Sequence, residues 1–179
     1  TVVIQRAFDP ALTFRLIGEE KIDVLFGVPA IFLFLIQNPG FKSGGMASLR
    51  SVMSGGAPLP VSLVHQYKEA GIILQQGFGM SEAAPGIAAL DRDRAVAKAG
   101  SIGRPLFYME VRIVDSQNRD LRPNREGELL IRGPNVMQKY WNRPEDTALA
   151  LREGWLHTGD LAWMDEDGFF YYVDKMKNK

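Results

Sequence analysis

The sequence predicts an α/β protein in which a parallel α/β sheet layer is followed by a smaller, mostly antiparallel β-sheet or distorted barrel. In residues 1–100, short apolar runs alternate with helical segments across short links, which is typical of parallel sheets with right-handed crossovers. In residues 101–174, strand-like runs follow one another across polar turns, which is typical of antiparallel pairing. We therefore expect two structural units that divide near residue 100.

The helices of the first half have clear start signals. Asp9-Pro10 predicts an N-cap followed by proline in the first helical position, and Pro29 and Pro60 open two further helices. The run that follows Asp23 is apolar throughout, as expected for a strand buried on both faces of a parallel sheet. The predicted elements are strands at 2–4, 23–28, 49–53 and 72–75 and helices at 10–18, 29–36 and 60–71.

The second half contains strand-like runs that are separated by turns. Polar residues at 115–119 and 165–168 predict tight turns. The acidic segment 165–168 lacks the spacing and the distal Glu of an EF-hand calcium loop, which favours a hairpin turn there. The predicted elements are strands at 111–114, 128–132 and 169–173 and a helix at 144–151.

Composition and charge exclude several classes of protein. The 179 residues are 46% hydrophobic and 23% charged, a globular composition that argues against disorder. Lys plus Arg number 21 and Asp plus Glu number 21, so no net charge draws the chain to nucleic acid or to an anionic membrane. The absence of cysteine removes disulfides and thiolate chemistry and makes the cytoplasm the default compartment. The longest uncharged apolar stretch, 24–36, is shorter than the ~20 residues of a transmembrane helix.

Two loops of small residues follow adjacent strands of the predicted parallel sheet. They cover residues 54–60 and 75–82, and the carboxyl ends of parallel strands meet at the edge where ligands bind. Paired glycines adopt positive φ, and small residues let a flat ligand approach the backbone. In the second loop, Phe78 offers an aromatic face for a base and Ser81 offers a hydroxyl. Glu82 is a single carboxylate of the kind that holds Mg²⁺ beside substrate phosphates.

Each of these features also has a simpler interpretation. Residues 55–56 could be only a strand-to-helix turn, and residues 81–82 only a helix cap with an acid in its first turn. Either loop alone favours the simpler interpretation, whereas two such loops on adjacent strands favour a ligand site. Asp160, which follows a glycine, could accept both hydroxyls of a ribose or could lie in a polar turn.

Five segments occur in a specific order along the chain. They are Ser-Gly-Gly-Ala-Pro-Leu at 54–59, Gln-Gly-Phe-Gly-Met-Ser-Glu at 76–82, Gly-Glu-Leu-Leu-Ile-Arg-Gly at 127–133, the run from Tyr140-Trp-Asn to Trp-Leu-His-Thr-Gly-Asp at 155–160, and Val-Asp-Lys-Met-Lys at 173–177. Together these segments resemble the adenylate-forming enzymes, and specifically the fatty acyl-CoA synthetases. The resemblance covers almost the whole chain and implies part of the large N-terminal domain of such an enzyme.

The resemblance implies that the parent protein is an ATP-dependent acid–thiol ligase. In this family, a carboxylic acid attacks the α-phosphate of Mg·ATP to give acyl-AMP and pyrophosphate, and the thiol of coenzyme A then displaces AMP. A fatty acid is the expected substrate. ATP or AMP, Mg²⁺ and coenzyme A are therefore the implied cofactors and co-substrate, and peripheral membrane contact and a homodimer stay open.

The resemblance also assigns roles position by position. Residues 56–58 would line the adenine, and Phe78, which replaces a family Tyr, would stack on it. Ser81, which replaces Thr, would meet the α-phosphate or the acyl carbonyl, Glu82 would hold Mg²⁺ and Asp160 would hold the ribose. The implied nucleotide-binding residues are Gly56, Ala57, Pro58, Gln76, Gly77, Phe78, Gly79, Met80, Ser81, Asp160 and Lys175, with Glu82 as the metal ligand and Gly79, Met80, Ala83 and Pro85 at the border of the acyl pocket.

Several positions depart from the family pattern. Lys175 stands where the family has Arg, so it keeps the charge but loses the planar guanidinium fork. Lys177 takes the hinge position and Asn178 stands where an acid is common, and residues 175–179 would begin a hinge to a C-terminal domain. Both ends of the chain look cut, and the family's phosphate loop would precede Thr1. We therefore expect this chain to be inactive alone and assign it no catalytic residue.

Three other functions fit the same residues. The substrate could be an aryl or an amino acid, in which case adenylation is kept and only the acid changes. The chain could be a catalytically inert nucleotide-binding module, or a structural domain that binds no nucleotide. Phe32, Phe34 and Met80 favour an apolar acyl chain.

Overall fold

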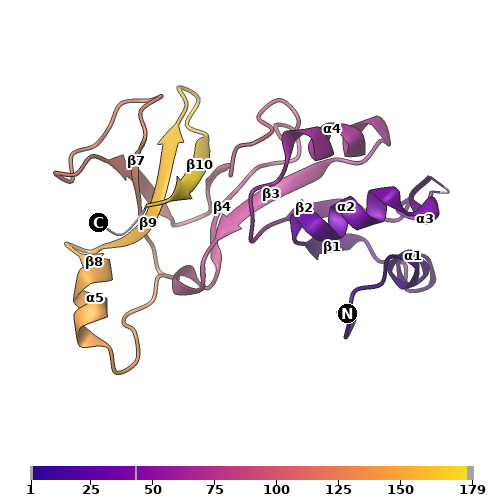
Figure 1. Cartoon of the computed structure of the whole chain (residues 1–179), viewed down its shortest axis with the longest axis horizontal. Helices are drawn as coiled ribbons and strands as arrows, with labels where there is room; N and C mark the ends of the chain where they lie inside the picture. Colours follow the sequence, from indigo (N-terminus) through magenta and orange to yellow (C-terminus); the bar gives the residue numbers. More distant parts are fainter. Residues whose placement is uncertain (1, 43, 177–179) are drawn as a thin grey trace. The chain divides into compact units, whose positions relative to one another are not determined.

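The computed structural model describes residues 2–42 and 44–176, and the chain forms two compact units (Figure 1). Strand β3 (Leu74–Gly79) begins in the first unit and ends in the second. The segment that follows β3 therefore belongs with the second half of the chain. Unit 1 consists of residues 1–76 and 92–99, and unit 2 consists of residues 77–91 and 100–179.

Unit 1 is a parallel α/β layer, which confirms the predicted fold class for this part. Strand β1 pairs in parallel with β2, and β2 pairs in parallel with the first half of β3. Helices alternate with these strands along the chain (Figure 1). The elements are α1 (Pro10–Glu19), β1 (Val24–Gly27), α2 (Pro29–Gln37), α3 (Pro39–Lys42), β2 (Ser51–Ser54) and α4 (Val61–Glu69).

The helix starts follow the local signals in the sequence. The Asp9 carboxylate accepts a hydrogen bond from the backbone N–H of Leu12 at 2.9 Å, so it caps α1 as predicted. Proline occupies the first turn of α1 and of α2, where a missing N–H costs no helical hydrogen bond. The first turn of a helix leaves its backbone N–H groups unpaired. The Asp9 carboxylate accepts one of them, and proline has no N–H to leave unpaired.

Tyr67 joins two helices in the core of unit 1. Its side chain on α4 is fully buried, and its hydroxyl donates to the backbone carbonyl of Phe32 on α2 at 2.8 Å. Its ring also makes edge-on contacts with Phe32 and Phe41. Burial raises the pKa of the Tyr67 hydroxyl above its usual value. A buried phenol with its own acceptor is therefore part of the packing of this unit.

Two predictions for unit 1 are wrong. Residues 2–4 form no strand, and Val2 and Ile4 are 81% and 84% exposed. Strand β1 is not buried on both faces, because Val24 and Phe26 are 58% and 64% exposed. An apolar run indicates a strand, but it does not show which faces of that strand other elements cover. In the described part of the chain, the face of β1 that carries Val24 and Phe26 is exposed.

Unit 2 is antiparallel throughout, as predicted for the second half. The end of β3 pairs with β4, and β4 pairs with β5. A second sheet has the order β10-β9-β7-β6, and β8 pairs with β9 beside it. The elements are the 3₁₀ turn η1 (Ser81–Ala83), β4 (Gly86–Ala89), β5 (Arg104–Pro105), β6 (Glu110–Val114), β7 (Gly127–Arg132), α5 (Pro144–Ala150), β8 (Leu151–Arg152), β9 (Trp155–Met164) and β10 (Phe170–Lys175).

Two segments that the sequence presented as loops or turns lie partly or wholly in strands. The segment 75–82 was expected to be a loop, but β3 continues through it to Gly79, because its backbone pairs with β4. The segment 155–160 contains polar residues that suggested a turn, but it forms the first part of β9. The hairpin turn predicted at 165–168 is confirmed, since it connects β9 to β10 and the Asp165 N–H donates to the Phe169 carbonyl at 2.9 Å.

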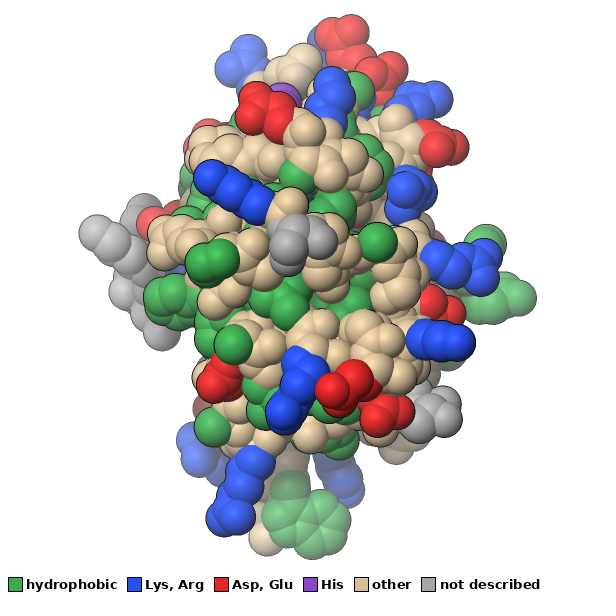
Figure 2. All heavy atoms as spheres, turned by 90° about the vertical axis from the view of Figure 1, so that its right-hand side faces the viewer, with side chains coloured by type: hydrophobic (Ala, Val, Ile, Leu, Met, Phe, Trp, Pro, Cys, Tyr) green, Lys and Arg blue, Asp and Glu red, His purple; other side chains and the backbone are tan. Residues whose placement is uncertain are grey.

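The surface of unit 1 includes large apolar side chains that are about half exposed. Besides β1, the helix α2 exposes Leu33 and Phe34, at 46% and 53%. Figure 2 shows hydrophobic side chains reaching the surface between Lys, Arg, Asp and Glu on one face of the molecule. Among the described residues, no helix is both long enough and apolar enough to cross a bilayer.

Candidate functional site

The predicted site residues fall into both units. Gly56, Ala57, Pro58 and Gln76 belong to unit 1, and the others belong to unit 2. Within unit 1, Ser54 of β2 and Gln76 of β3 are partners in the parallel register. The segment 55–60, which follows Ser54, therefore begins beside Gln76. Lys177 and Asn178, which were expected at the hinge, lie outside the described residues.

The turn after β2 has the backbone that its glycines allow. Gly56 has a φ of +83°, a left-handed conformation that favours glycine. Residues 56–58 are exposed, whereas Leu59 is buried and anchors the turn in the core of unit 1. The Ser54 hydroxyl is buried and has no hydrogen-bond partner among the described residues. The turn thus presents exposed backbone next to a buried hydroxyl without a partner.

The motif at 76–82 is shaped by close backbone contacts in unit 2. A Cβ on Gly79 would lie 1.8 Å from the carbonyl oxygen of Pro85, so this position requires glycine. The N–H of Met80 donates to the same oxygen at 2.9 Å. The side-chain amide of Asn135 donates to the carbonyls of Ala83 and Gly86, at 2.5 and 2.8 Å. These contacts fix η1, which carries Ser81 and Glu82.

Glu82 is held by a side chain that the sequence analysis did not single out. The Tyr140 hydroxyl donates to Glu82 Oε1 at 2.8 Å. The backbone N–H of Tyr140 in turn donates to the Thr147 hydroxyl on α5 at 3.0 Å. Burial, with the Glu82 hydrogen bond as the second cause, raises the pKa of Tyr140 to about 12. One oxygen of Glu82 is thus fixed by a neutral donor.

Asp160 is a buried acid on β9. It is 2% exposed, and its backbone partner on β10 is Lys175. The Lys175 ammonium nitrogen lies 2.6 Å from Asp160 Oδ1, yet this oxygen accepts no hydrogen bond of good geometry from the described residues. Because the Lys175 side chain is 65% exposed, the lysine reaches in from the surface. A buried carboxylate whose charge is offset by one lysine can accept hydroxyls of a ligand.

Phe78 pairs with an aromatic ring of β10. The rings of Phe78 and Tyr172 have centroids 6.1 Å apart and are tilted by 34°. Burial, and then the charge of Asp160, raise the pKa of the Tyr172 hydroxyl above its usual value. Unit 2 therefore holds Phe78 against the ring of Tyr172 and Lys175 against the carboxylate of Asp160.

The residues of unit 2 fit the groups of a nucleotide with magnesium. The buried carboxylate of Asp160 can accept a ribose diol, and the Phe78 ring can stack on a base. Glu82 has one oxygen beyond the one bound by Tyr140, which fits Mg²⁺ held by one carboxylate and substrate phosphates. In the described ranges, no three or more His, Cys, Asp or Glu residues gather as a metal-binding group.

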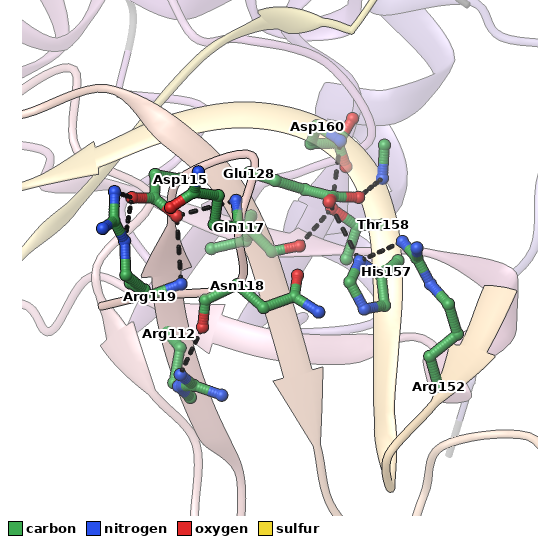
Figure 3. Close-up of polar contacts among 12 residues, drawn as sticks. Arg112, Asp115, Gln117, Asn118, Arg119, Glu128, Arg152, His157, Thr158 and Asp160 are labelled. Carbon is green, nitrogen blue, oxygen red and sulfur yellow. Dashed lines mark hydrogen bonds and ion pairs between the residues drawn. The ribbon is translucent and has the colours of Figure 1, made fainter. Parts of the chain in front are cut away.

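A network of polar contacts surrounds the segment that carries Asp160 (Figure 3). The Thr158 hydroxyl donates to the Leu129 carbonyl at 2.7 Å and accepts from the Asp160 N–H at 3.1 Å. Glu128 Oε1 accepts from the Gly159 N–H at 3.3 Å, and its other oxygen lies 2.9 Å from His157 Nδ1. Glu128 and Tyr140 lie in segments that carry the family resemblance, but they had no predicted role, because only the fold brings Glu128 to the Asp160 segment and Tyr140 to Glu82.

The comparisons with known proteins place this fold and site in a family. Residues 1–141 match the family described as AMP-binding enzyme, and the chain belongs to this family. The resemblance to adenylate-forming enzymes is thereby confirmed. The relatives described below are CoA synthases and ligases, together with an amide bond synthetase.

The relatives extend over almost the whole chain. It is 42% identical over 178 residues to feruloyl-CoA synthase of Amycolatopsis sp, covering 99% of this chain and 36% of that one. It is 37% identical over 179 residues to long-chain-fatty-acid–CoA ligase of Bacillus subtilis (strain 168), covering 99% and 32%. The chain thus spans about a third of the length of these relatives.

Solved structures confirm the fold. Amide bond synthetase from Marinactinospora thermotolerans superposes with a TM-score of 0.92 at 36% identity, covering 99% of this chain and 36% of that one. O-succinylbenzoate coenzyme A synthetase from Bacillus subtilis, in complex with ATP and magnesium ion, gives a TM-score of 0.88 at 31% identity, covering 98% and 36%. The parallel α/β layer followed by an antiparallel sheet is therefore the fold of this family.

Proposed function

We propose that the protein is an AMP-forming acid–thiol ligase, which activates a carboxylic acid as acyl-AMP and transfers the acyl group to coenzyme A. The observation that carries the proposal is the buried Asp160 carboxylate, which has Lys175 beside it in the unit that also holds the Phe78–Tyr172 ring pair. Such a group has a high cost of burial unless a ligand or a cation satisfies it. Membership of the AMP-binding family supports the same conclusion.

The proposed reaction has two steps. A carboxylate oxygen of the acid bonds to the α-phosphorus of ATP as the bond to pyrophosphate breaks. The thiolate sulfur of coenzyme A then bonds to the acyl carbon, and AMP leaves. Because the reacting groups are anionic, positioning and charge neutralisation are expected to dominate catalysis. Mg²⁺ bound at Glu82 would neutralise phosphate charge.

The proposed roles of the chain's residues follow from their chemistry. Asp160 accepts the ribose hydroxyls, and Lys175 offsets its charge from the adjacent strand. Phe78 contacts the adenine with its ring, while Ser81 offers its hydroxyl to the α-phosphate or acyl carbonyl. Tyr140 orients Glu82 toward the cation. The other residues proposed to line the nucleotide or acyl pocket are Gly56, Ala57, Pro58, Gln76, Gly77, Gly79 and Met80.

A fatty acid is the proposed substrate, and an aryl acid is the second candidate. The apolar residues Phe32, Phe34 and Met80 were the reason to expect an apolar acyl chain. The feruloyl-CoA synthase relative, at 42% identity, is the specific observation that favours an aryl acid. We further propose that residues 175–179 begin the hinge to a C-terminal domain.

Binding of a non-hydrolysable acyl-adenylate analogue to the full-length protein tests the proposal. Asp160→Ala should weaken binding, measured by calorimetry, on the order of 100-fold, because a charged acceptor of two hydroxyls is lost. The control is Glu166→Ala, which removes an exposed carboxylate from the turn between β9 and β10. Unchanged binding in Asp160→Ala would support the inert-module alternative, and no binding to the unsubstituted protein would support a structural domain.

A further inference from the structure

The segment that carries Asp160 is a bulge in the pairing of β9 with β7. Glu128 of β7 faces Leu161, and Leu130 faces His157, so a single residue of β7 faces the three residues 158–160. A bulge bends its strand and turns side chains away from the regular ladder. Gly159 supplies the required backbone with a φ of +66°. The direction of the Asp160 side chain therefore depends on what holds this bulge.

The bulge cannot use the regular ladder to satisfy its backbone, and side chains replace it. Thr158 bonds the Leu129 carbonyl and the Asp160 N–H. The Gly159 N–H is left for Glu128, whose Oε1 accepts it at 3.3 Å, at the long end of the range for such a bond. The Gly159 carbonyl accepts from the N–H of Met176, just after β10, at 2.7 Å. Glu128 is thus the side-chain acceptor that holds the middle of the bulge from β7.

The second oxygen of the Glu128 side chain lies against His157. Oε2 lies 2.9 Å from Nδ1 of His157, whose side chain is 5% exposed, whereas that of Glu128 is 18% exposed. The Arg152 guanidinium reaches the same ring nitrogen at 2.6 Å. Figure 3 shows Glu128 between His157 on one side and the Thr158–Asp160 bulge on the other. The carboxylate therefore lies between the Gly159 N–H and the His157 ring.

We propose that Glu128 is a positioning residue for ribose recognition. Its acceptor oxygen holds the Gly159 N–H and thereby keeps the Asp160 carboxylate aimed at the ribose hydroxyls. This inference rests on the proposed function, in which Asp160 binds the ribose. What matters is an acceptor of the right length rather than the negative charge, because the group it holds is a neutral N–H.

Two substitutions of similar size separate the acceptor from the charge. Glu128→Leu removes the acceptor and the charge, whereas Glu128→Gln removes the charge but keeps an oxygen for the Gly159 N–H. The full-length protein is titrated by calorimetry with AMP and with 2′,3′-dideoxy-AMP, and the ratio of the two dissociation constants is the readout. The ratio does not depend on the folded fraction, so partial unfolding of a variant does not obscure it.

The unsubstituted protein should bind AMP on the order of 100-fold more tightly than the dideoxy nucleotide, and Asp160→Ala should abolish this preference. Glu128→Leu should lower the preference at least about tenfold, mainly by weakening AMP, whereas Glu128→Gln should keep most of it. The control is Glu126→Gln, at an exposed glutamate just before β7, which should keep the full preference.

The outcomes that overturn the inference are distinct from failure of the proposed function. A Glu128→Leu variant that keeps the full preference, or that weakens both nucleotides equally, would show that Glu128 does not act through Asp160. Equal loss in the Leu and Gln variants would show that charge acts rather than the acceptor, and would also overturn the inference. If Asp160→Ala keeps the preference, the ribose assignment of the proposed function fails, and this inference fails with it.

Discussion

Glu82 and Tyr140 meet across 58 positions of the sequence. The carboxylate stands on η1, and the hydroxyl that binds it comes from the segment before α5, where Thr147 secures its backbone. A group that orients a metal ligand commonly sets the affinity for the metal. The side-chain environment of Glu82 therefore matters as much as its presence.

Replacing Tyr140 with Phe should weaken the use of magnesium. Tyr140→Phe removes the donor to Glu82 Oε1 and leaves the ring in place, so the half-saturating Mg²⁺ concentration for ATP binding should rise about tenfold. Calorimetric ATP titrations of the full-length protein at several Mg²⁺ concentrations measure this shift. Tyr108→Phe, at an 87% exposed tyrosine, is the control. An unchanged magnesium dependence in Tyr140→Phe would show that Tyr140 does not orient Glu82 for magnesium binding.

The signals of individual residues predicted much of the candidate site. Phe78, Asp160 and Lys175 were selected from the sequence, and unit 2 contains both the Asp160–Lys175 ion pair and the Phe78–Tyr172 ring pair. Glu128 could not be selected, because its role depends on the register between β7 and β9 and not on its sequence neighbours. Long-range pairing of this kind is set by the fold as a whole.

At the level of elements, helices were easier to predict than strands. Asp9-Pro10 and Pro29 act through local backbone chemistry, which the sequence displays directly. Strand β9 was not predicted, because Thr158 and Asp160 are polar although they occupy buried positions of the alternating pattern. Strand β3 was cut short because its end is rich in glycine, which usually signals a loop.

The hairpin of β3 and β4 should not tolerate a side chain at Gly79. Gly79→Ala puts a Cβ within 1.8 Å of the Pro85 carbonyl oxygen, so the backbone must shift, and the free energy of unfolding should fall by about 2 kcal/mol. Urea unfolding measures the change. Gly18→Ala is the matched control, because a Cβ there meets nothing within 4 Å and the helical position should become slightly more stable. Equal stability of both variants would contradict the packing described here.

At the scale of the molecule, each of the two units contains a tyrosine whose hydroxyl has a raised pKa. Unit 1 contains a fully buried tyrosine, Tyr67, together with exposed apolar side chains such as Phe26 and Phe34. Unit 2 contains Tyr140, whose hydroxyl is engaged by Glu82. Both tyrosines have a raised pKa, so their protons link the stability of each unit to pH.

The free energy of unfolding should fall as the pH rises above about 10. An unfolded tyrosine loses its proton near pH 10.0, while Tyr140 keeps its proton to about 12 and Tyr67 also keeps it beyond its usual range. Above pH 10 the unfolded chain therefore binds fewer protons than the folded chain, so the stabilisation is complete below this pH and is lost above it. Urea unfolding at about pH 9 and about pH 11 measures the slope. Tyr67→Phe should flatten it, whereas the exposed Tyr108→Phe should not, and equal slopes would refute the linkage.

The bulge at residues 158–160 has a consequence for the lengths that β9 can adopt. Between its pairings with residues 128 and 130, β9 advances four residues where β7 advances two. Because this excess is even, Leu156 before the bulge and Ala162 after it both face the core. Inserting or deleting one residue here would turn all later side chains of β9 to the opposite face, whereas a change of two would not. Natural length variation in this segment should therefore occur in steps of two residues.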